Sequence, residues 1–174
     1  MDLRQRELRI RTAQAADVQT LIRWWNDGAV MAHAGFPNGL GITAERIMKQ
    51  LAENRNGIRE LLILEDGGER IGEMNYRAGA PGVAEIGIKI CEATRQNGGR
   101  GRRFLTMLLQ ELFRMGFQRV CLDTDLNNLR AQHVYESLGF RKTGVRYNSW
   151  TDQLGNLRSA VDYELLPGEL RPFE

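Results

Sequence analysis

A ten-residue stretch at 95–104, RQNGGRGRRF, places three glycines and four arginines directly before an apolar helical pattern. The first turn of a helix carries backbone N–H groups without intrahelical partners, and the helix dipole makes this end positive. Glycines let an anion approach these N–H groups closely, and arginines add positive charge. The combination indicates a phosphate-binding loop; the alternative, on composition alone, is a solvated basic turn.

The two most widespread phosphate-binding motifs do not fit this stretch. The P-loop ends in Gly-Lys-Ser/Thr, and that ending is absent here. The dinucleotide-binding pattern G-x-G-x-x-G fails because Phe104 stands where its third glycine would be. The loop therefore belongs to neither motif.

The elements that would position this loop alternate between strands and helices. The turn Asp66-Gly67-Gly68 between two apolar runs predicts a β-hairpin, and Gly116 suits the end of the helix after the loop. The segment 26–42 is predicted to be a long, glycine-punctuated loop. Hydrophobic periodicity predicts strands at 7–13, 59–65, 69–77, 83–91, 119–125, 140–150 and 157–165, and helices at 15–25, 43–51, 104–115 and 127–139. This order indicates an α/β (α+β) protein with a mostly antiparallel or mixed sheet.

Length and composition predict a single domain over residues 1–174. The chain has 42% hydrophobic and 26% charged residues, as ordinary globular proteins have. Its net charge of +2 is too small for a general nucleic-acid binder. Isolated histidines and the lack of metal-ligand spacing predict no metal site.

The sequence also predicts a cytoplasmic protein without a membrane segment. No apolar run approaches the ~20 residues that a membrane span needs, and the N-terminus lacks the apolar core of a signal peptide. Cys91 and Cys121 both fall in apolar, strand-like stretches, which favours two buried thiols in a reducing compartment over a disulfide.

Three segments together carry a resemblance to a known family. The run Gln96-Asn97-Gly98-Gly99-Arg100-Gly101 resembles the Q/R-x-x-G-x-G/A signature of the GNAT superfamily of N-acetyltransferases, which cradles the pyrophosphate of acetyl-CoA. AEIGIKI at 84–90 looks like the fourth strand of that family, and NLRAQHVYESLGF at 128–140 resembles its N-x-x-A-x-x-x-Y-E-x-L-G-F segment. The segments occur in the family's order and at nearly its spacing.

The resemblance covers about residues 7–165 and is strongest over 84–140. The stretch IRWWNDGAV at 22–30 is most like the branch of ribosomal-protein N-terminal (Rim-type) acetyltransferases. That branch also contains polyamine and aminoglycoside acetylators, so the acceptor stays open. The connection from Ile90 to the glycines is a residue longer than is usual in the branch.

The resemblance implies a GNAT fold and acetyl-CoA as co-substrate. The expected sheet is twisted, mixed and mostly antiparallel, has helices on both faces, and is splayed between its fourth and fifth strands, 83–91 and 119–125. Pantetheine would lie in the opening between these strands. Asn128 would bind pantetheine or fix the nearby loop, the alternative being a plain helix N-cap. The residues implied to bind the cofactor are Ile88, Ile90, Gln96, Asn97, Gly98, Gly99, Arg100, Gly101, Arg102 and Asn128.

Two residues are candidates for acid–base catalysis. Tyr135 occupies the family's general-acid position; a phenol with a pKa of about 10 can protonate a thiolate whose conjugate acid has a pKa of about 8.5. Glu85 is the candidate base, because the family often has a glutamate on this strand. Asp123 and Asp125, at the end of the next strand, compete with Glu85, as does water. The structural alternatives are core packing for Tyr135 and a solvent-facing strand position for Glu85.

Family analogy places the acceptor between the loop after the first helix and the last hairpin. The residues expected there are Trp25, Asn26, His33, Phe36 and Trp150. The alternatives are core packing for Trp25 and an ordinary hydrogen-bonding role for His33.

The resulting hypothesis is an acetyl-CoA-dependent N-acetyltransferase that acts by direct transfer in a ternary complex. Its acceptor partner would be a protein N-terminus, or a small amine such as a polyamine or an aminoglycoside. A non-catalytic acyl-CoA sensor and an RNA-associated module that uses the basic loop are the alternatives. A homodimer is as compatible with the sequence as a monomer.

Overall fold

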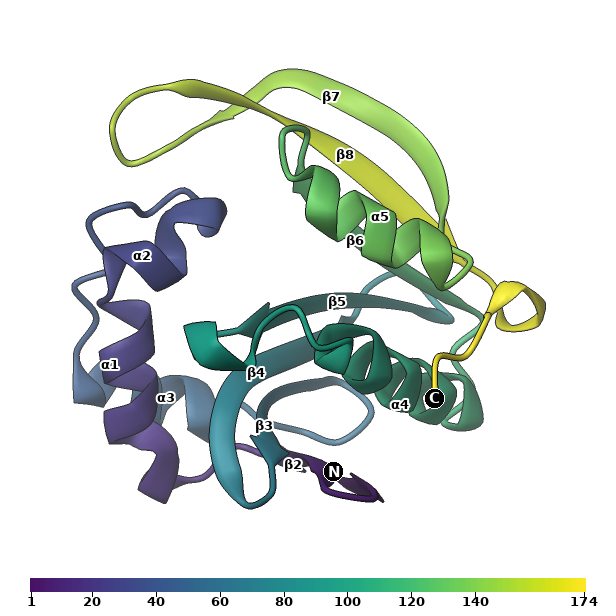
Figure 1. Ribbon diagram of the computed structural model, residues 1–174, viewed down its shortest axis with the longest axis horizontal. Helices are drawn as coiled ribbons and strands as arrows, with labels where there is room; N and C mark the ends of the chain where they lie inside the picture. The colour runs from purple at the N-terminus through teal and green to yellow at the C-terminus, as the bar shows by residue number, and fades with distance from the viewer.

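The computed structural model describes all residues from 1 to 174 (Figure 1). The strands are β1 (Asp2–Gln5), β2 (Leu8–Thr12), β3 (Arg59–Asp66), β4 (Glu69–Ala78), β5 (Val83–Ile90), β6 (Arg119–Asp125), β7 (Arg141–Thr151) and β8 (Leu157–Leu165). The α-helices are α1 (Val18–Trp25), α2 (Gly28–Met31), α3 (Ala44–Ala52), α4 (Arg100–Arg114) and α5 (Leu129–Ser137), and the 3-10 helices are η1 (Ala15–Asp17), η2 (Ala32–Ala34), η3 (Ala93–Arg95) and η4 (Pro167–Glu169). None of these helices is long and apolar enough to cross a membrane.

All eight strands form one sheet in the order β1-β2-β3-β4-β5-β6-β8-β7. Every neighbouring pair is antiparallel except β5 and β6, which run parallel. These two strands pair only over Val83–Glu85 and Arg119–Cys121 and then separate. The expected splay between 83–91 and 119–125 is therefore confirmed, and it opens toward the C-terminal ends of β5 and β6.

Helices cover both faces of the sheet, as Figure 1 shows. On one face α4 and α5 pack on the larger hydrophobic core, to which α4 contributes a nearly continuous buried run from Phe104 to Leu109. On the other face α1 and α3 pack over a smaller core that includes Trp24, Ile47 and Ile63. Because successive strand residues alternate between faces, β5 sends Ile86 into the larger core and Glu85 to the opposite face.

Local turn signals match the structure. Gly67 and Gly68 both have positive φ in the turn between β3 and β4, so the expected hairpin is confirmed. Gly116 has a φ of 99° directly after α4, as its expected role at the helix end requires.

Three parts of the chain differ from the expectation. The helix predicted to begin at residue 104 already begins at Arg100, so the end of the predicted loop is helical. The first predicted strand pairs with an additional strand, β1, to form an N-terminal hairpin. The predicted loop at 26–42 contains α2 and η2, because the Asp27 side chain accepts a hydrogen bond from the Ala29 N–H and caps a short helix. Gly28 is required there, since a Cβ atom would lie 1.9 Å from the Pro37 carbonyl oxygen.

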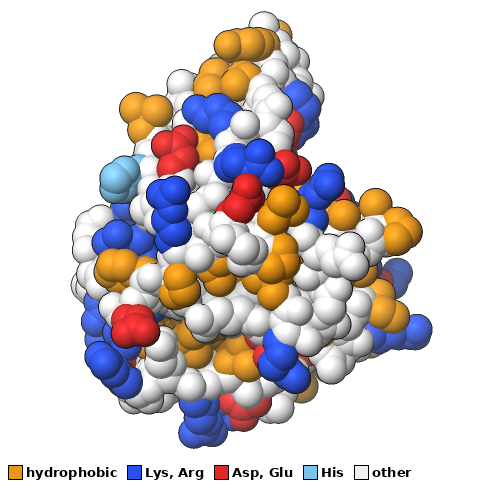
Figure 2. Space-filling view, turned by 90° about the vertical axis from the view of Figure 1, so that its right-hand side faces the viewer, with side chains coloured by type: hydrophobic (Ala, Val, Ile, Leu, Met, Phe, Trp, Pro, Cys, Tyr) orange, Lys and Arg blue, Asp and Glu red, His pale blue; other side chains and the backbone are white.

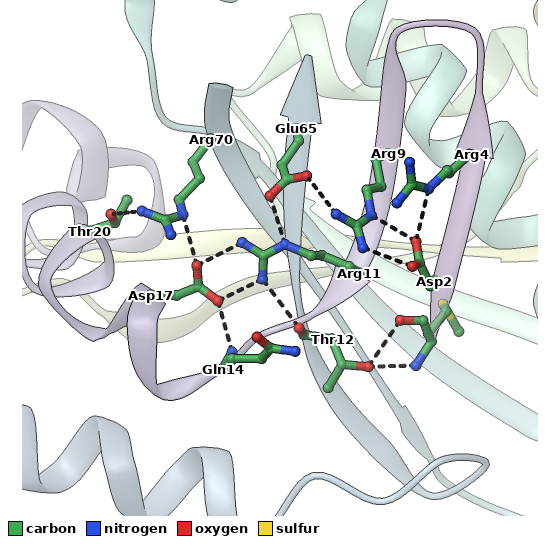
Figure 3. Close-up of polar contacts among 11 residues, drawn as sticks. Asp2, Arg4, Arg9, Arg11, Thr12, Gln14, Asp17, Thr20, Glu65 and Arg70 are labelled. Atoms are coloured by element: carbon green, nitrogen blue, oxygen red, sulfur yellow. Dashed lines mark hydrogen bonds and ion pairs between the residues drawn. The ribbon is translucent and has the colours of Figure 1, made fainter. Parts of the chain in front are cut away.

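A buried ion-pair network fixes the first helix against the sheet (Figure 3). The fully buried Asp17, just before α1, receives two hydrogen bonds from Arg11 on β2 and an ion pair from Arg70 on β4. Arg11 also contacts Glu65 on β3 at 2.6 Å. Burial by itself raises the pKa of Asp17. The hydrogen bonds that Asp17 accepts from Arg11 and from the Gln14 N–H, together with the charges of the two arginines, outweigh burial and hold this pKa below its usual range. The network thus sets the position of α1, and with it that of α2.

Candidate active site

A cavity of about 780 Å³ runs through the opening between β5 and β6. On the α4–α5 side it is lined by Ile88, Ile90, Gln96, Gly101, Leu105, Asn128, Arg130, Ala131, Val134 and Tyr135. On the α2–β7 side it is lined by Ala29, Val30, His33, Ala34, Glu73, Asn75, Gly87, Lys89, Asp123, Asp125, Arg146 and Trp150. We call these the cofactor half and the acceptor half, after the roles proposed below.

The glycine-rich loop forms the entrance to the cofactor half at the N-terminus of α4. Gly99 is the N-cap residue of α4, and its φ of 74° lies in the left-handed region that favours glycine. No side chain caps this end of the helix. The N–H groups of Arg100, Gly101 and Arg102 have no hydrogen-bond acceptor. A Cβ atom at Gly101 would meet nothing within 4 Å, so the first turn of α4 has open space beside this residue. This geometry can hold a phosphate group.

The arginines of the loop differ in their contacts. Arg95 pairs with Glu69 and lies 3.5 Å from Asp66, and Arg100 contacts the same Asp66 at 2.6 Å. Both therefore anchor the loop to the β3–β4 hairpin. Sequence reasoning assigned Arg100 to the cofactor together with Arg102, because an ion pair across the fold leaves no local signal.

Side-chain amides connect the loop with the end of β5 and the beginning of α5. Gln96 donates to the Ile90 carbonyl oxygen at 3.0 Å and accepts from Arg130 at 3.4 Å. Asn128 caps α5 by accepting from the Ala131 N–H at 3.2 Å, and it also lines the cavity. The two expectations for Asn128, a helix cap and a cavity residue, are therefore compatible. Asn97 has a φ of 68° and holds the loop's turn.

Tyr135 lies on α5 and lines the cofactor half of the cavity, within range of the charge of Asp123 from the acceptor half. Its ring packs at 5.8 Å from the ring of Phe140 and at 5.9 Å from that of Tyr163, and only 8% of the residue is exposed. Its hydroxyl has no protein hydrogen-bond partner. Burial, with a smaller contribution from Asp123, raises the pKa of Tyr135 to about 12. The phenol is thus protonated at neutral pH and available as a proton donor.

The carboxylates near the opening divide into two groups. Glu85 does not line the main cavity; it pairs with Arg77 at 2.6 Å and lies beside a separate surface pocket. Glu73 on β4 does line it, is only 5% exposed, and has one ionic partner, Lys89 Nζ at 3.4 Å. The antiparallel pairing of β4 with β5 places Glu73 opposite Lys89.

The two aspartates of β6 are already bound by arginines. Asp125 is buried, accepts from Arg158 at 2.9 Å and caps the turn at Asn127. Asp123 is exposed and contacts Arg146 at 2.7 Å. Of the carboxylates in the acceptor half, Glu73 thus has the weakest pairing.

Only part of the expected acceptor set reaches the cavity. His33 and Trp150 line it. The Trp150 ring packs against Gly35, in the space that a larger side chain there would need. Trp25 is buried in the smaller core, and the Asn26 side chain exchanges two hydrogen bonds with the Ile42 backbone. Phe36 is 38% exposed and outside the lining.

Sequence reasoning missed Glu73, Asn75, Lys89 and Arg130. Period-2 alternation could have found three of them, because Glu73 and Asn75 share a strand face and lie across from Lys89 and Gly87. Gly87 lies in a regular stretch of pairing, and a Cβ atom there would approach the Asn75 amide to 2.9 Å. Arg130 is in the first turn of α5, at a position that carries no motif of its own.

Comparisons with known proteins agree with this geometry. Residues 7–141 match the family described as acetyltransferase (GNAT) domain. None of the curated proteins matches the chain.

Several solved structures share the fold at low sequence identity. Spermidine N-acetyltransferase from Vibrio cholerae, in complex with CoA and spermine, is 18% identical, with a TM-score of 0.83 over 95% of this chain and 98% of that chain. Ribosomal-protein-alanine N-acetyltransferase from Brucella melitensis is 22% identical, with a TM-score of 0.76 over 90% and 98% of the chains. RimL, a ribosomal α-N-protein acetyltransferase in complex with CoA, is 18% identical, with a TM-score of 0.81 over 95% and 98%.

The family match spans most of the chain and includes the splayed strands and the glycine-rich loop. The chain therefore belongs to the GNAT family of acetyltransferases, enzymes that take their acetyl group from acetyl-CoA.

Proposed function

We propose that this protein is a cytoplasmic N-acetyltransferase that transfers the acetyl group of acetyl-CoA directly to a primary amine in a ternary complex. The observation that carries the proposal is the continuous cavity through the splayed strands, with Tyr135 in its lining. Acetyl-CoA would enter the cofactor half with its pyrophosphate at the α4 N-terminus. The amine would enter the acceptor half, beneath α2 and the β7–β8 hairpin. The two cysteines are free, with Cys91 buried as expected and Cys121 only half-buried, and free thiols fit a reducing compartment.

The reaction needs one proton acceptor and one proton donor. A neutral amine attacks the thioester carbonyl, a C–N bond forms, and the C–S bond breaks with the electron pair leaving on sulfur. Because a protonated amine cannot attack, a base must first remove its proton. The Tyr135 hydroxyl, which carries its proton at neutral pH, would give that proton to the leaving thiolate.

Glu73 is the stronger candidate for the base, and Glu85 is the alternative. We expect Glu73→Gln to lower kcat/KM by roughly 10²-fold, with the largest loss below the pKa of the acceptor amine, where most of the amine arrives protonated. Glu85→Gln, the matched control, removes a carboxylate that is paired with Arg77 outside the cavity, so its pH–rate profile should match the wild-type profile. The opposite pattern would assign the base to Glu85, and two unchanged profiles would assign the role to water.

Charge pairing in the acceptor half favours the amino terminus of a peptide over a polyamine. A polyamine needs several free carboxylates for its separate ammonium groups. Here Asp123 and Asp125 are already held by arginines, and Glu73 lies next to Lys89. A peptide N-terminus presents one amine to Glu73 and leaves the other ion pairs intact.

A panel of acceptors with acetyl-CoA tests this assignment. We expect thiol release with peptides that carry a free α-amino group, and at least about tenfold lower kcat/KM with spermidine or an aminoglycoside, whose extra charges would have to displace existing ion pairs. Peptides with a blocked N-terminus are the control and should not react. A preference for spermidine would contradict the assignment of the acceptor. If none of the amines in the panel caused thiol release, the result would favour an acyl-CoA sensor.

A further inference from the structure

The C-terminal segment after η4 crosses from α5 to the beginning of α4. The Arg171 N–H donates to the Leu138 carbonyl oxygen at the end of α5, at 2.9 Å. The Phe173 N–H then donates to Thr106 Oγ1 on α4, at 3.0 Å. Figure 1 shows the C-terminus lying over α4. Two hydrogen bonds donated by backbone N–H groups therefore direct this segment toward the glycine-rich loop.

The Phe173 ring lies directly against the loop. A Cβ atom built on Gly99 would be 3.0 Å from the ring, so the ring fills the space beside this glycine. The guanidinium carbon of Arg102 stands 3.8 Å from the centre of the ring. Phe173 is half-buried in this position and packs against the larger core. The ring thus determines where the Arg102 side chain lies.

Arg102 differs from the other arginines of the loop in having no carboxylate partner. Arg95 and Arg100 pair with Glu69 and Asp66, and Arg103 contacts Glu7 at 2.7 Å. An arginine stacked on an aromatic face is held in place, while its N–H edges stay free to donate. Arg102 is therefore the cation of the loop that can bind an anion without breaking an ion pair.

We propose that Phe173 is a positioning residue for the cofactor, and that it holds Arg102 so that its guanidinium binds a phosphate of the nucleotide portion of acetyl-CoA. This inference rests on the proposed function for the identity of the ligand. The free N–H groups of the first turn of α4 bind the same phosphate region, so Arg102 and the helix N-terminus act together. Arg95 and Arg100 hold the loop in shape and do not carry this role.

The test compares Phe173→Leu with wild type, using acetyl-CoA, acetyl-dephospho-CoA and S-acetylpantetheine as donors. Leucine keeps the apolar packing but removes the aromatic face. We expect KM for acetyl-CoA to rise about fivefold to thirtyfold with kcat unchanged, as expected for a lost cation–π contact that orients a phosphate ligand. KM for S-acetylpantetheine, which has no phosphate, should not change. A raised KM for acetyl-dephospho-CoA would assign Arg102 to the pyrophosphate. An unchanged KM for this donor would assign Arg102 to the 3′-phosphate.

The matched control is Phe113→Leu, the same substitution at a half-buried position of α4 in its last turn. It should leave KM for all three donors unchanged. An equal rise of KM for S-acetylpantetheine in Phe173→Leu would show a general packing effect and overturn the proposal, as would unchanged or tighter binding of acetyl-CoA.

Direct titration with CoA separates this inference from the proposed function, because it needs neither an acceptor nor turnover. Weaker CoA binding by Phe173→Leu than by wild type supports the positioning role. Equal CoA binding by the two proteins overturns the positioning role and leaves the acetyltransferase assignment intact. Wild-type protein that does not bind CoA would overturn both.

Discussion

Tyr135→Phe is expected to lower kcat by roughly 10²–10⁴-fold, the range typical for the loss of a general acid. Phenylalanine keeps the ring and its edge-on contacts with Phe140 and Tyr163 but removes the hydroxyl. That hydroxyl has no hydrogen-bond partner within the protein, so its loss leaves no buried group unsatisfied and stability should change little. Steady-state kinetics with acetyl-CoA and a thermal melt measure the two effects.

The choice of acyl donor distinguishes a proton donor from a packing residue. A thioester with a more acidic thiol needs less protonation as it leaves, so the deficit of Tyr135→Phe should shrink with such a donor. CoA affinity should stay the same, because the loop at the α4 N-terminus is untouched. Wild-type turnover in Tyr135→Phe, with chemistry shown to limit the rate, would restrict Tyr135 to its role in the core.

Gly101→Glu should raise KM for acetyl-CoA by on the order of 10²-fold, while the protein stays folded. Gly101 is in the first turn of α4 and lines the cavity, and a Cβ atom there meets no protein atom within 4 Å. A glutamate therefore fits the fold, and at a helix N-terminus it is electrostatically favourable. Its carboxylate would, however, stand where the proposed site holds a phosphate and would repel it.

Gly168→Glu is the matched control for this substitution. Gly168 is exposed, lies outside the cavity lining and also has open space around it. It should leave KM for acetyl-CoA at the wild-type value. Normal CoA affinity in folded Gly101→Glu would show that the loop is not the phosphate site. Gly99 is unsuitable for this test, because its φ of 74° and the nearby Phe173 ring strain any replacement.

The distribution of charged side chains on the surface tests the alternative that the protein is an RNA-associated module. On the side of the molecule in Figure 2, Lys and Arg side chains lie among Asp, Glu and hydrophobic side chains and form no continuous basic face. The projection at the top, formed by β7 and β8, carries hydrophobic side chains; Tyr147, Leu154 and Leu157 of this hairpin region are exposed. The basic loop itself is partly neutralised by Asp66 and Glu69.

The sequence by itself determined the features that depend on neighbouring residues. The turn at Gly67 and Gly68, the helix end at Gly116 and the alternation of Glu85 with Ile86 follow from backbone geometry over a few residues. The family motif can also be read from the sequence, because its glycines lie at fixed spacing within one loop and its tyrosine lies at a fixed place within one helix.

The tertiary structure decided which of the candidate groups are free to act. Asp66 neutralises Arg100, Arg77 holds Glu85 outside the cavity, and Phe173 leaves Arg102 available. Each of these contacts joins residues from different elements, so neither residue of a pair signals the other in the sequence. A charged side chain near a site has the same local pattern whether it is paired or free. Coulomb and stacking interactions depend on distance in space. Whether a side chain is paired or free is therefore decided by which segments approach it: the β3–β4 hairpin, the neighbouring strand or the C-terminal segment.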